Sequence, residues 1–117
     1  MNRDEVIAYC LARPGAEETY PWGDGELVAK VGGKAFAFIG LGAGSHAVTL
    51  KCGRTGDEAA IWRDRYPDAV TASAYIGRYG WNSIGLDGTV PTDEVRELID
   101  DSYAAIVAKL PKSRRPA

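Results

Sequence analysis

Few side chains in this sequence have the types and spacing that catalysis or metal binding requires. His46 is the only histidine, and it stands at the end of a glycine-rich segment, GLGAGS, which predicts a solvent-exposed loop position. The acidic pairs Glu17-Glu18 and Asp100-Asp101 are adjacent in sequence, so on a helix their carboxylates would diverge instead of sharing a proton or a metal ion. Because no histidine cluster and no nucleophile–base pair is visible, the sequence predicts no catalytic residue, no metal site and no cofactor.

The cysteines and the glycine-rich segment also favour structural roles. Cys10 and Cys52 lie far apart and form no CxxC motif, so neither a zinc site nor a disulfide framework is indicated, and we expect two reduced thiols. GLGAGS has GxGxG spacing and no GK[ST] ending, and the segment after it, HAVTLKC, alternates as a strand does. Since a phosphate-binding loop would open a helix, we interpret GLGAGS as a hairpin tip.

The most suggestive chemistry lies in residues 76–91, IGRYGWNSIGLDGTVP, where a cation and aromatic rings share one predicted hairpin. Strand alternation predicts which way these side chains point. If Ile84 faces the helices, then Trp81 lies on the opposite, open face of the sheet. Lys30 and Lys51, on other predicted strands, point away from their apolar neighbours and are expected on the same open face.

A surface of lysines and aromatic rings has two interpretations. In the first, rings stack on bases and cations contact phosphates, with stacking worth about 1–3 kcal/mol per base. The candidate nucleic-acid-binding residues are then Lys30, Lys51, Arg78, Tyr79 and Trp81. In the second, Trp81 covers sheet area by packing on Tyr79, Tyr75 or a lysine stem, as aromatic cross-strand neighbours commonly do. We interpret Trp22 and Trp62 as packing residues of the core or its rim.

Length and charge restrict the partners. The 117 residues fit one domain, and a net charge of −2 argues against a protein that coats nucleic acid by bulk electrostatics. The one basic cluster is the tail around residues 111–117, which we interpret as solvated. No apolar run approaches the roughly 20 residues of a membrane span, and the N-terminus lacks a signal-peptide apolar region. We therefore expect a cytoplasmic protein without membrane contacts, and we expect it to be a monomer.

Hydrophobic periodicity predicts three helices and about five strands. The helices are expected to begin at caps formed by Asn2, Thr55 and Thr92 and to end before prolines. The strands are expected at residues 26–31, 34–39, 46–52, 72–76 and 81–86. In the second of these, Phe36 and Phe38 should share one face. The pattern predicts an α+β domain in which the N- and C-terminal helices pack on one face of a single antiparallel sheet.

An ordered set of short motifs gives the sequence a family resemblance. The motifs are PWG, KVGGKAFA, VTLKC, RYP, WNSIGLDGTVP, LIDDSY and KLPK. From about Tyr20 to Lys112 the chain resembles the MmcQ/YjbR family. The resemblance implies a CyaY-like (frataxin-like) α+β fold, a bacterial cytosolic protein, and DNA binding through a double-wing arrangement of hairpins. Related sequences commonly carry His and Lys in the turn before the tryptophan, whereas this turn reads GRYG and keeps Arg78 as its cation.

Two functions remain open at this stage. Iron delivery of the frataxin kind is not expected, because an acidic ridge would need many carboxylates in the first helix, which has only Asp4 and Glu5. The first function is weak, non-enzymatic DNA binding through the basic and aromatic hairpin and the open sheet face. The alternative is a protein-interaction or small-ligand-binding module on the same face, without nucleic acid.

Overall fold

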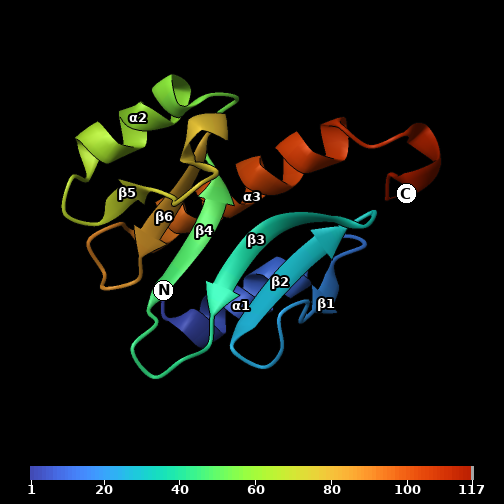
Figure 1. The fold of residues 1–117 in the computed structure, drawn as a ribbon, viewed down its shortest axis with the longest axis horizontal. Helices are drawn as coiled ribbons and strands as arrows, with labels where there is room; N and C mark the ends of the chain where they lie inside the picture. The colour runs from blue at the N-terminus through green and yellow to red at the C-terminus, as the bar shows by residue number, and fades with distance from the viewer. Residues whose placement is uncertain (117) are drawn as a thin grey trace.

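Six antiparallel strands form the sheet of the computed structural model, which describes residues 1–116 (Figure 1). The strands are β1 (Glu17–Thr19), β2 (Glu26–Val31), β3 (Lys34–Gly40), β4 (Ala47–Lys51), β5 (Val70–Ala72) and β6 (Trp81–Gly85). Their order across the sheet is β1-β2-β3-β4-β6-β5, and every neighbouring pair is antiparallel. The sequence missed β1, whose three residues, EET, carry two charges and suit an exposed edge strand.

Three α-helices cover one face of this sheet. They are α1 (Arg3–Leu11), α2 (Gly56–Arg65) and α3 (Thr92–Ala108), and short 3-10 turns form η1 (Gly77–Tyr79) and η2 (Lys112–Arg114). Helices α1 and α3 lie behind the central strands, and α2 lies over β5 and β6 (Figure 1). The α+β class and the placement of both terminal helices on one sheet face are confirmed. Within residues 1–116, no helix combines the length and the apolar character needed to cross a membrane.

Cross-strand register explains the core. Leu27, Ile39, Val48, Ile84 and Val70 form one row across five strands, and each is at most 2% exposed. Because residues paired across strands point to the same side, this row meets the apolar stripe of α3. The buried members of that stripe are Val95, Leu98, Ile99 and Ile106. The core therefore lies between the sheet and the helices, and among residues 1–116 no α-helix covers the other sheet face.

A β-bulge breaks the alternation that the sequence predicts for β3. Ala29 and Lys30 pair with Ala37 and Ala35, so Phe36 is left over on its strand. Phe36 is fully buried, with its ring 5.3 Å from that of Tyr103 on α3 and edge-on to it. The prediction that Phe36 and Phe38 share a face is therefore wrong, because the extra residue sends Phe38 to the open face.

The three α-helices begin differently from one another. Asn2 and Glu5 form the predicted reciprocal capping box of α1. Thr55 caps α2, but the Glu58 carboxylate accepts the backbone N–H of Arg54 at 2.7 Å instead of closing a box. The prediction that Thr92 caps α3 is wrong, because Thr92 is the first helical residue and Pro91 holds the cap position. The Thr92 hydroxyl accepts a hydrogen bond from the N-terminal amine of the chain at 3.2 Å, which links the two terminal helices.

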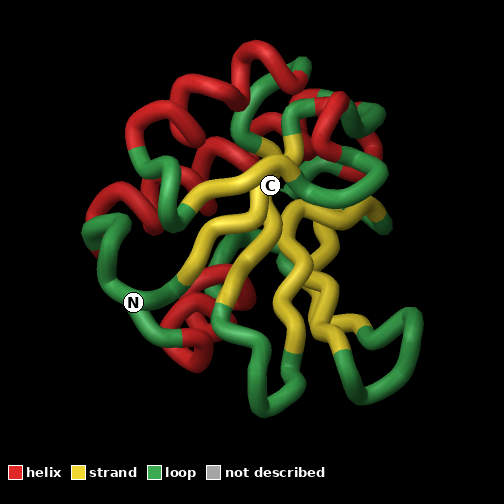
Figure 2. The backbone as a smooth tube through the Cα atoms, turned by 60° about the vertical axis from the view of Figure 1, so that its left-hand side comes forward, coloured by secondary structure: helices red, strands yellow, loops and turns green. Residues whose placement is uncertain are grey.

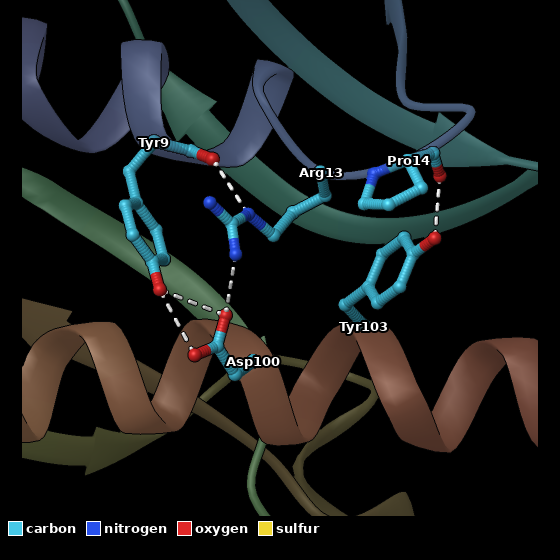
Figure 3. Close-up of polar contacts among 5 residues, drawn as sticks. All are labelled: Tyr9, Arg13, Pro14, Asp100 and Tyr103. Carbon is cyan, nitrogen blue, oxygen red and sulfur yellow. Dashed lines mark hydrogen bonds and ion pairs between the residues drawn. The ribbon is translucent and has the colours of Figure 1, made fainter.

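A polar cluster fastens α1 to α3 (Figure 3). The Tyr9 hydroxyl contacts both carboxylate oxygens of Asp100, at 2.9 and 3.0 Å, and the Arg13 guanidinium donates to the same carboxylate at 3.2 Å. Burial and the Asp100 carboxylate raise the pKa of Tyr9. One turn further along α3, the Tyr103 hydroxyl donates to the carbonyl of Pro14. These contacts fix the end of α1 against α3, and every group in them has a partner, so we assign the cluster a structural role.

Candidate binding face

The open sheet face carries a row of three aromatic rings. In register, Val28, Phe38, Thr49, Ser83 and Thr71 lie side by side across the sheet. The Phe38 ring meets Trp81 edge-on at 5.4 Å between centroids, and Trp22 stacks on its other side at 6.4 Å. We call Trp22, Phe38 and Trp81 the aromatic row. It confirms that Trp81 faces away from the helices, and it shows that Trp81 packs on another ring, Phe38, rather than on Tyr75 or Tyr79.

A pocket of about 450 Å³ opens beside this row. Its aromatic walls are Trp22, Phe38 and Tyr75, its polar groups are those of Glu26, Thr49 and Ser73, and Ala74 and Ile76 complete the lining. We call it the aromatic pocket. The connection between β1 and β2 supplies Trp22, and the turn after β5 supplies the residues from 73 to 76. Its lining contains a carboxylate but neither lysine nor arginine, so it does not suit a phosphate group.

Two of the pocket's rings are exposed to solvent. Trp22 is 71% exposed and Tyr75 is 97% exposed, among the highest values for large hydrophobic residues in the part of the chain that the structure describes. The expectation that Trp22 is a packing residue of the core or rim is wrong, because most of its surface is free although its ring stacks on Phe38. Trp62, by contrast, is partly buried against the core, as predicted. Large exposed rings that border a pocket typically mark interaction sites.

Tyr75 is held in an unusual backbone conformation. Its φ is 64°, the one positive value at a non-glycine residue within residues 1–116. The turn is closed by hydrogen bonds from Gly77 N to Ser73 O at 2.9 Å and from Ile76 N to Ala74 O at 2.7 Å. The sequence predicted a strand over 72–76, which is wrong: β5 ends at Ala72, and this turn follows it. A strained residue with a fully exposed ring is a common feature of binding sites.

Lys51 is not available to a phosphate in the way the sequence predicts. It is 5% exposed, and its ammonium donates a hydrogen bond to the carbonyl of Tyr79. Burial, followed by the nearby Lys109 ammonium, lowers the pKa of Lys51. The residues after η1 close over the end of β4, where Cys52 N donates to Gly80 O at 2.7 Å. Alternation gave the register of Lys51 with Trp81 correctly, but the loop that covers its side chain was not predicted.

The remaining predicted residues are placed as follows. Arg78 and Tyr79 are exposed on η1, with the guanidinium 4.8 Å from the centre of the Tyr79 ring. The Lys51 ammonium is 6.0 Å from the ring of Trp81, so these four residues lie at one end of β4 and β6. Lys30 lies apart from them on β2, opposite Glu17, and β3 separates its strand from β4, which carries Lys51. The structure thus gathers four of the five residues, and the two cations among these four lie in different environments, since Lys51 is buried and Arg78 is exposed.

None of the residues that line the aromatic pocket was predicted as a site residue, and the missed residues that give it its chemistry are Trp22, Glu26, Phe38 and Tyr75. The motif PWG marked Trp22 without indicating its exposure. Phe38 could have been found only by anticipating the bulge, and Tyr75 only by recognising that SAYIG forms a turn. His46, by comparison, is an exposed loop residue as predicted, and the glycine-rich loop beside it is held by Arg3, which donates to the carbonyls of Gly42 and Ser45 at 2.8 Å.

Comparison with known families identifies the chain. The family model described as YjbR matches residues 11–105. The chain belongs to the YjbR family. The uncharacterised protein YjbR of Escherichia coli K12 is 31% identical over 117 residues, covering 98% of this chain and 95% of that protein. The family assignment predicted from the sequence motifs is therefore confirmed, and it brings no established activity with it.

Solved structures share the fold of this YjbR-family chain. Deinococcus radiodurans protein DR2400, a DUF419 domain, superposes with a TM-score of 0.84 at 26% identity, over 95% of this chain and 83% of that one. A Pseudomonas syringae protein has the same fold, with a TM-score of 0.71 at 20% identity over 91% of this chain and 99% of that one. A different kind of relative is the L-proline–[L-prolyl-carrier protein] ligase of Streptomyces coelicolor. It is 29% identical over 103 residues, which are 88% of this chain but 18% of the ligase.

Proposed function

We propose that this YjbR-family chain is a non-enzymatic interaction module that takes an apolar or cationic side chain of a partner protein into the aromatic pocket. The observation that carries the proposal is the composition of the pocket: three aromatic walls, two of them exposed, around one carboxylate. Tryptophan and tyrosine are the residues most often responsible for affinity at protein interfaces, because each buries a large area at little cost in side-chain entropy.

The single charged group of the pocket, the Glu26 carboxylate, limits which kinds of side chain can bind there. The carboxylate of Glu26 and the faces of Trp22 and Tyr75 all attract cations. A lysine or arginine can therefore pair its charge with the carboxylate while its aliphatic stem packs on the rings. An apolar side chain satisfies the rings alone. A phosphate or a carboxylate would face Glu26 without a compensating cation, and is disfavoured.

The relation to the Streptomyces coelicolor ligase supports an interaction module. The matching region makes up 18% of that protein, so in the ligase a region of this kind is part of a much longer chain. An accessory region attached to an enzyme that acts on a carrier protein is a natural place for protein contacts. The chain's own lack of a nucleophile–base pair, argued above from the sequence, is consistent with such a role.

Peptide binding tests this proposal. Short peptides that place a lysine, an arginine, a leucine or an aspartate at the centre of a neutral sequence would be titrated against the protein while its tryptophan fluorescence, to which Trp22 contributes, is followed. We expect the lysine, arginine and leucine peptides to bind and the aspartate peptide not to bind. Replacing Tyr75 or Trp22 with Ala should weaken binding by about tenfold, which corresponds to about 1.4 kcal/mol.

Matched variants distinguish binding in this pocket from non-specific binding to exposed apolar side chains. Ile61→Ala removes an apolar side chain that is 67% exposed on α2, away from the pocket, and should leave binding unchanged. Glu26→Gln should weaken the lysine and arginine peptides but not the leucine peptide. For the Trp22 variant, binding would be followed by calorimetry. If the pocket variants bind as the unchanged protein does, the proposal is wrong.

DNA binding, which the family resemblance implies, is a second candidate. The observation that favours it is the exposed pair of Arg78 and Tyr79 on η1, beside Trp81, with the basic residues of η2 at another surface. With Lys51 buried, few phosphates can be neutralised, so binding should be weak and its logarithmic salt slope shallow, on the order of −1 to −3 at about −0.9 per phosphate. Titrating single- and double-stranded DNA at two salt concentrations tests this. Arg78→Ala should reduce the slope by about one, whereas Trp22→Ala should not change it.

A further inference from the structure

A second pocket, of about 440 Å³, lies at the end of β4 where α2 begins and α3 ends. It shares no lining residue with the aromatic pocket. Its lining residues are Lys51, Cys52, Gly53, Arg54, Glu58, Asp101, Ala105, Ala108 and Lys109. We call it the lysine pocket. Three of the segments that carry the family resemblance meet here, since VTLKC, LIDDSY and KLPK supply Lys51, Asp101 and Lys109.

The charges of the lysine pocket are not balanced. Arg54 is paired with Glu58 at 2.8 Å. Neither Lys51 nor Lys109 forms an ion pair with a carboxylate within residues 1–116. Asp101 is therefore the remaining carboxylate for two ammonium groups, and the lining carries a surplus of one positive charge.

The buried lysine has hydrogen-bonding capacity left. An ammonium group carries three N–H donors, and one N–H of Lys51 is donated to the Tyr79 carbonyl. Burial and the neighbouring Lys109 lower the pKa of Lys51, which is the response expected of a cation that lacks an anionic partner. An anion between the two ammonium groups would relieve both effects.

The rest of the lining shows what the anion would be attached to. Ala105 and Ala108 lie one turn apart on the same side of α3, and Cys52 and Gly53 face them from the end of β4. These residues offer small apolar surfaces, and the one polar side chain among them, the Cys52 thiol, already donates to the carbonyl of Leu50 at 3.5 Å. A surplus of one positive charge matches a monoanion better than a phosphate dianion, which would also approach Glu58 and Asp101.

We propose that the lysine pocket binds the carboxylate of a small, apolar monocarboxylic acid. The ammonium groups of Lys51 and Lys109 hold the carboxylate, and the apolar body of the acid lies against Ala105, Ala108 and Gly53. The site is independent of the aromatic pocket and of the partner proposed for it. The volume is within the usual range of small-molecule sites.

Titration of the isotopically labelled full chain with three ligands tests this proposal. The ligands are hexanoate, 1-hexanol and hexyl phosphate. They share one apolar chain and differ in charge. We expect hexanoate to bind with a dissociation constant on the order of millimolar and to shift the amide resonances of Gly53, Ala105 and Ala108. Hexanol should bind at least about tenfold more weakly, because it lacks the charge that Lys51 and Lys109 require. Equal binding of hexanol, or tighter binding of hexyl phosphate, would overturn the assignment of a monocarboxylate site.

Variants locate the site. Lys109 is exposed, so Lys109→Gln should leave the fold intact and weaken hexanoate by about tenfold. Lys34→Gln, at an exposed lysine of the β2–β3 hairpin, is the matched control and should have no effect. Ala105→Leu keeps every charge and fills the pocket, and it should abolish binding. The inference is wrong if Lys109→Gln binds hexanoate normally, or if the shifts lie away from the lysine pocket. Trp22→Ala should leave hexanoate binding unchanged, so the proposals for the two pockets can be tested and rejected independently of each other.

Discussion

The aromatic pocket and the lysine pocket are built from opposite kinds of structure. The aromatic pocket takes Trp22 and Tyr75 from connections between strands, and both rings are exposed. The lysine pocket takes five of its nine lining residues from β4, α2 and α3, and its central lysine is buried. Connections can adapt to a partner's surface, whereas the ends of packed elements hold a fixed geometry. The difference suits the first to a protein partner and the second to a small ligand.

One segment, residues 73–80, belongs to both regions. Its first half lines the aromatic pocket, and its second half provides the Tyr79 carbonyl that accepts from Lys51. Gly80 anchors it: φ is 91°, and a Cβ there would lie 1.9 Å from the carbonyl oxygen of Gly53. No side chain fits without moving backbone. The position of residues 73–80, and with it the shape of both pockets, therefore depends on this one close approach of Gly80 to Gly53.

Gly80→Ala should have the largest effect on both pockets. The methyl group would push the segment away from Gly53 and break the Cys52–Gly80 hydrogen bond, lowering the free energy of unfolding by about 3 kcal/mol or more. Gly88→Ala is the matched control, since Gly88 has a φ of 89° and nothing within 4 Å of the added Cβ. It should cost about 1 kcal/mol, from the backbone alone. Urea denaturation measures both values, and equal losses would show that the close approach is unimportant.

Ser102→Ala should have the next largest effect, confined to the side of the lysine pocket. The buried Ser102 hydroxyl accepts from Lys51 N at 3.0 Å and donates to Phe36 O at 2.6 Å. It thereby joins β3 and β4 just beyond Ala37 and Leu50, the last residues that these two strands pair. Removing it leaves two buried backbone groups without partners, at a cost of about 2 kcal/mol in the free energy of unfolding. Ser83→Ala, on the open face, should cost less than about 0.5 kcal/mol by the same measurement.

The sequence predicted the regular elements better than the surfaces. Helix periodicity and strand alternation placed the core and put Trp81 on the open face, because both depend on local geometry. The same alternation failed for Phe38, where the β3 bulge adds one residue. It failed for Lys51 and Tyr75 because their environment is set by the loop 73–80, whose path depends on contacts with Gly53, distant in sequence. Periodicity gives the direction of a side chain but not what covers it.

The Cys52 thiol, which lines the lysine pocket, makes the free energy of unfolding depend on pH. Burial raises the pKa of Cys52 from 9.0 to about 11. The unfolded chain loses this proton first, so the thiol's contribution to stability is fully present below about pH 9 and is lost as pH rises to about 11. At pH 10 the loss is limited to about 1.4 kcal/mol for one pKa unit. Urea denaturation at pH 8 and pH 10 measures this loss: between the two pH values, the free energy of unfolding should decrease less for Cys52→Ala than for the unchanged protein.

Other groups with shifted pKa values also contribute at alkaline pH, among them Tyr9, Cys10 and Lys51, and all are accounted for by that comparison. Burial raises the pKa of Cys10 to about 12, which adds a loss of the same sign in both proteins. The lowered pKa of Lys51 acts in the opposite direction, because the folded chain then holds fewer protons than the unfolded one and gains stability as pH rises. These groups remain in Cys52→Ala and cancel in the difference. Identical pH dependence in the two proteins would contradict the assignment to Cys52.

Tyr75→Gly should have the smallest effect on stability, and its sign is the informative result. The Tyr75 ring is 97% exposed and contributes little to packing, while its φ of 64° is unfavourable for every residue except glycine. Relief of that conformation stabilises by about 1 kcal/mol, and the extra freedom of glycine in the unfolded chain offsets part of this. We therefore expect a free energy of unfolding unchanged or raised by up to about 0.5 kcal/mol.

The same substitution should weaken the lysine and leucine peptides by about tenfold, because it removes one wall of the aromatic pocket. Tyr75→Ala is the matched control: it also removes the ring but keeps the strained φ, so it should match Tyr75→Gly in binding and fall below it in stability. A protein that becomes more stable while it loses its partner has kept a strained residue for binding. If Tyr75→Gly is clearly less stable than the unchanged protein, the ring supports the fold, and the aromatic pocket is then a packing feature of the open face.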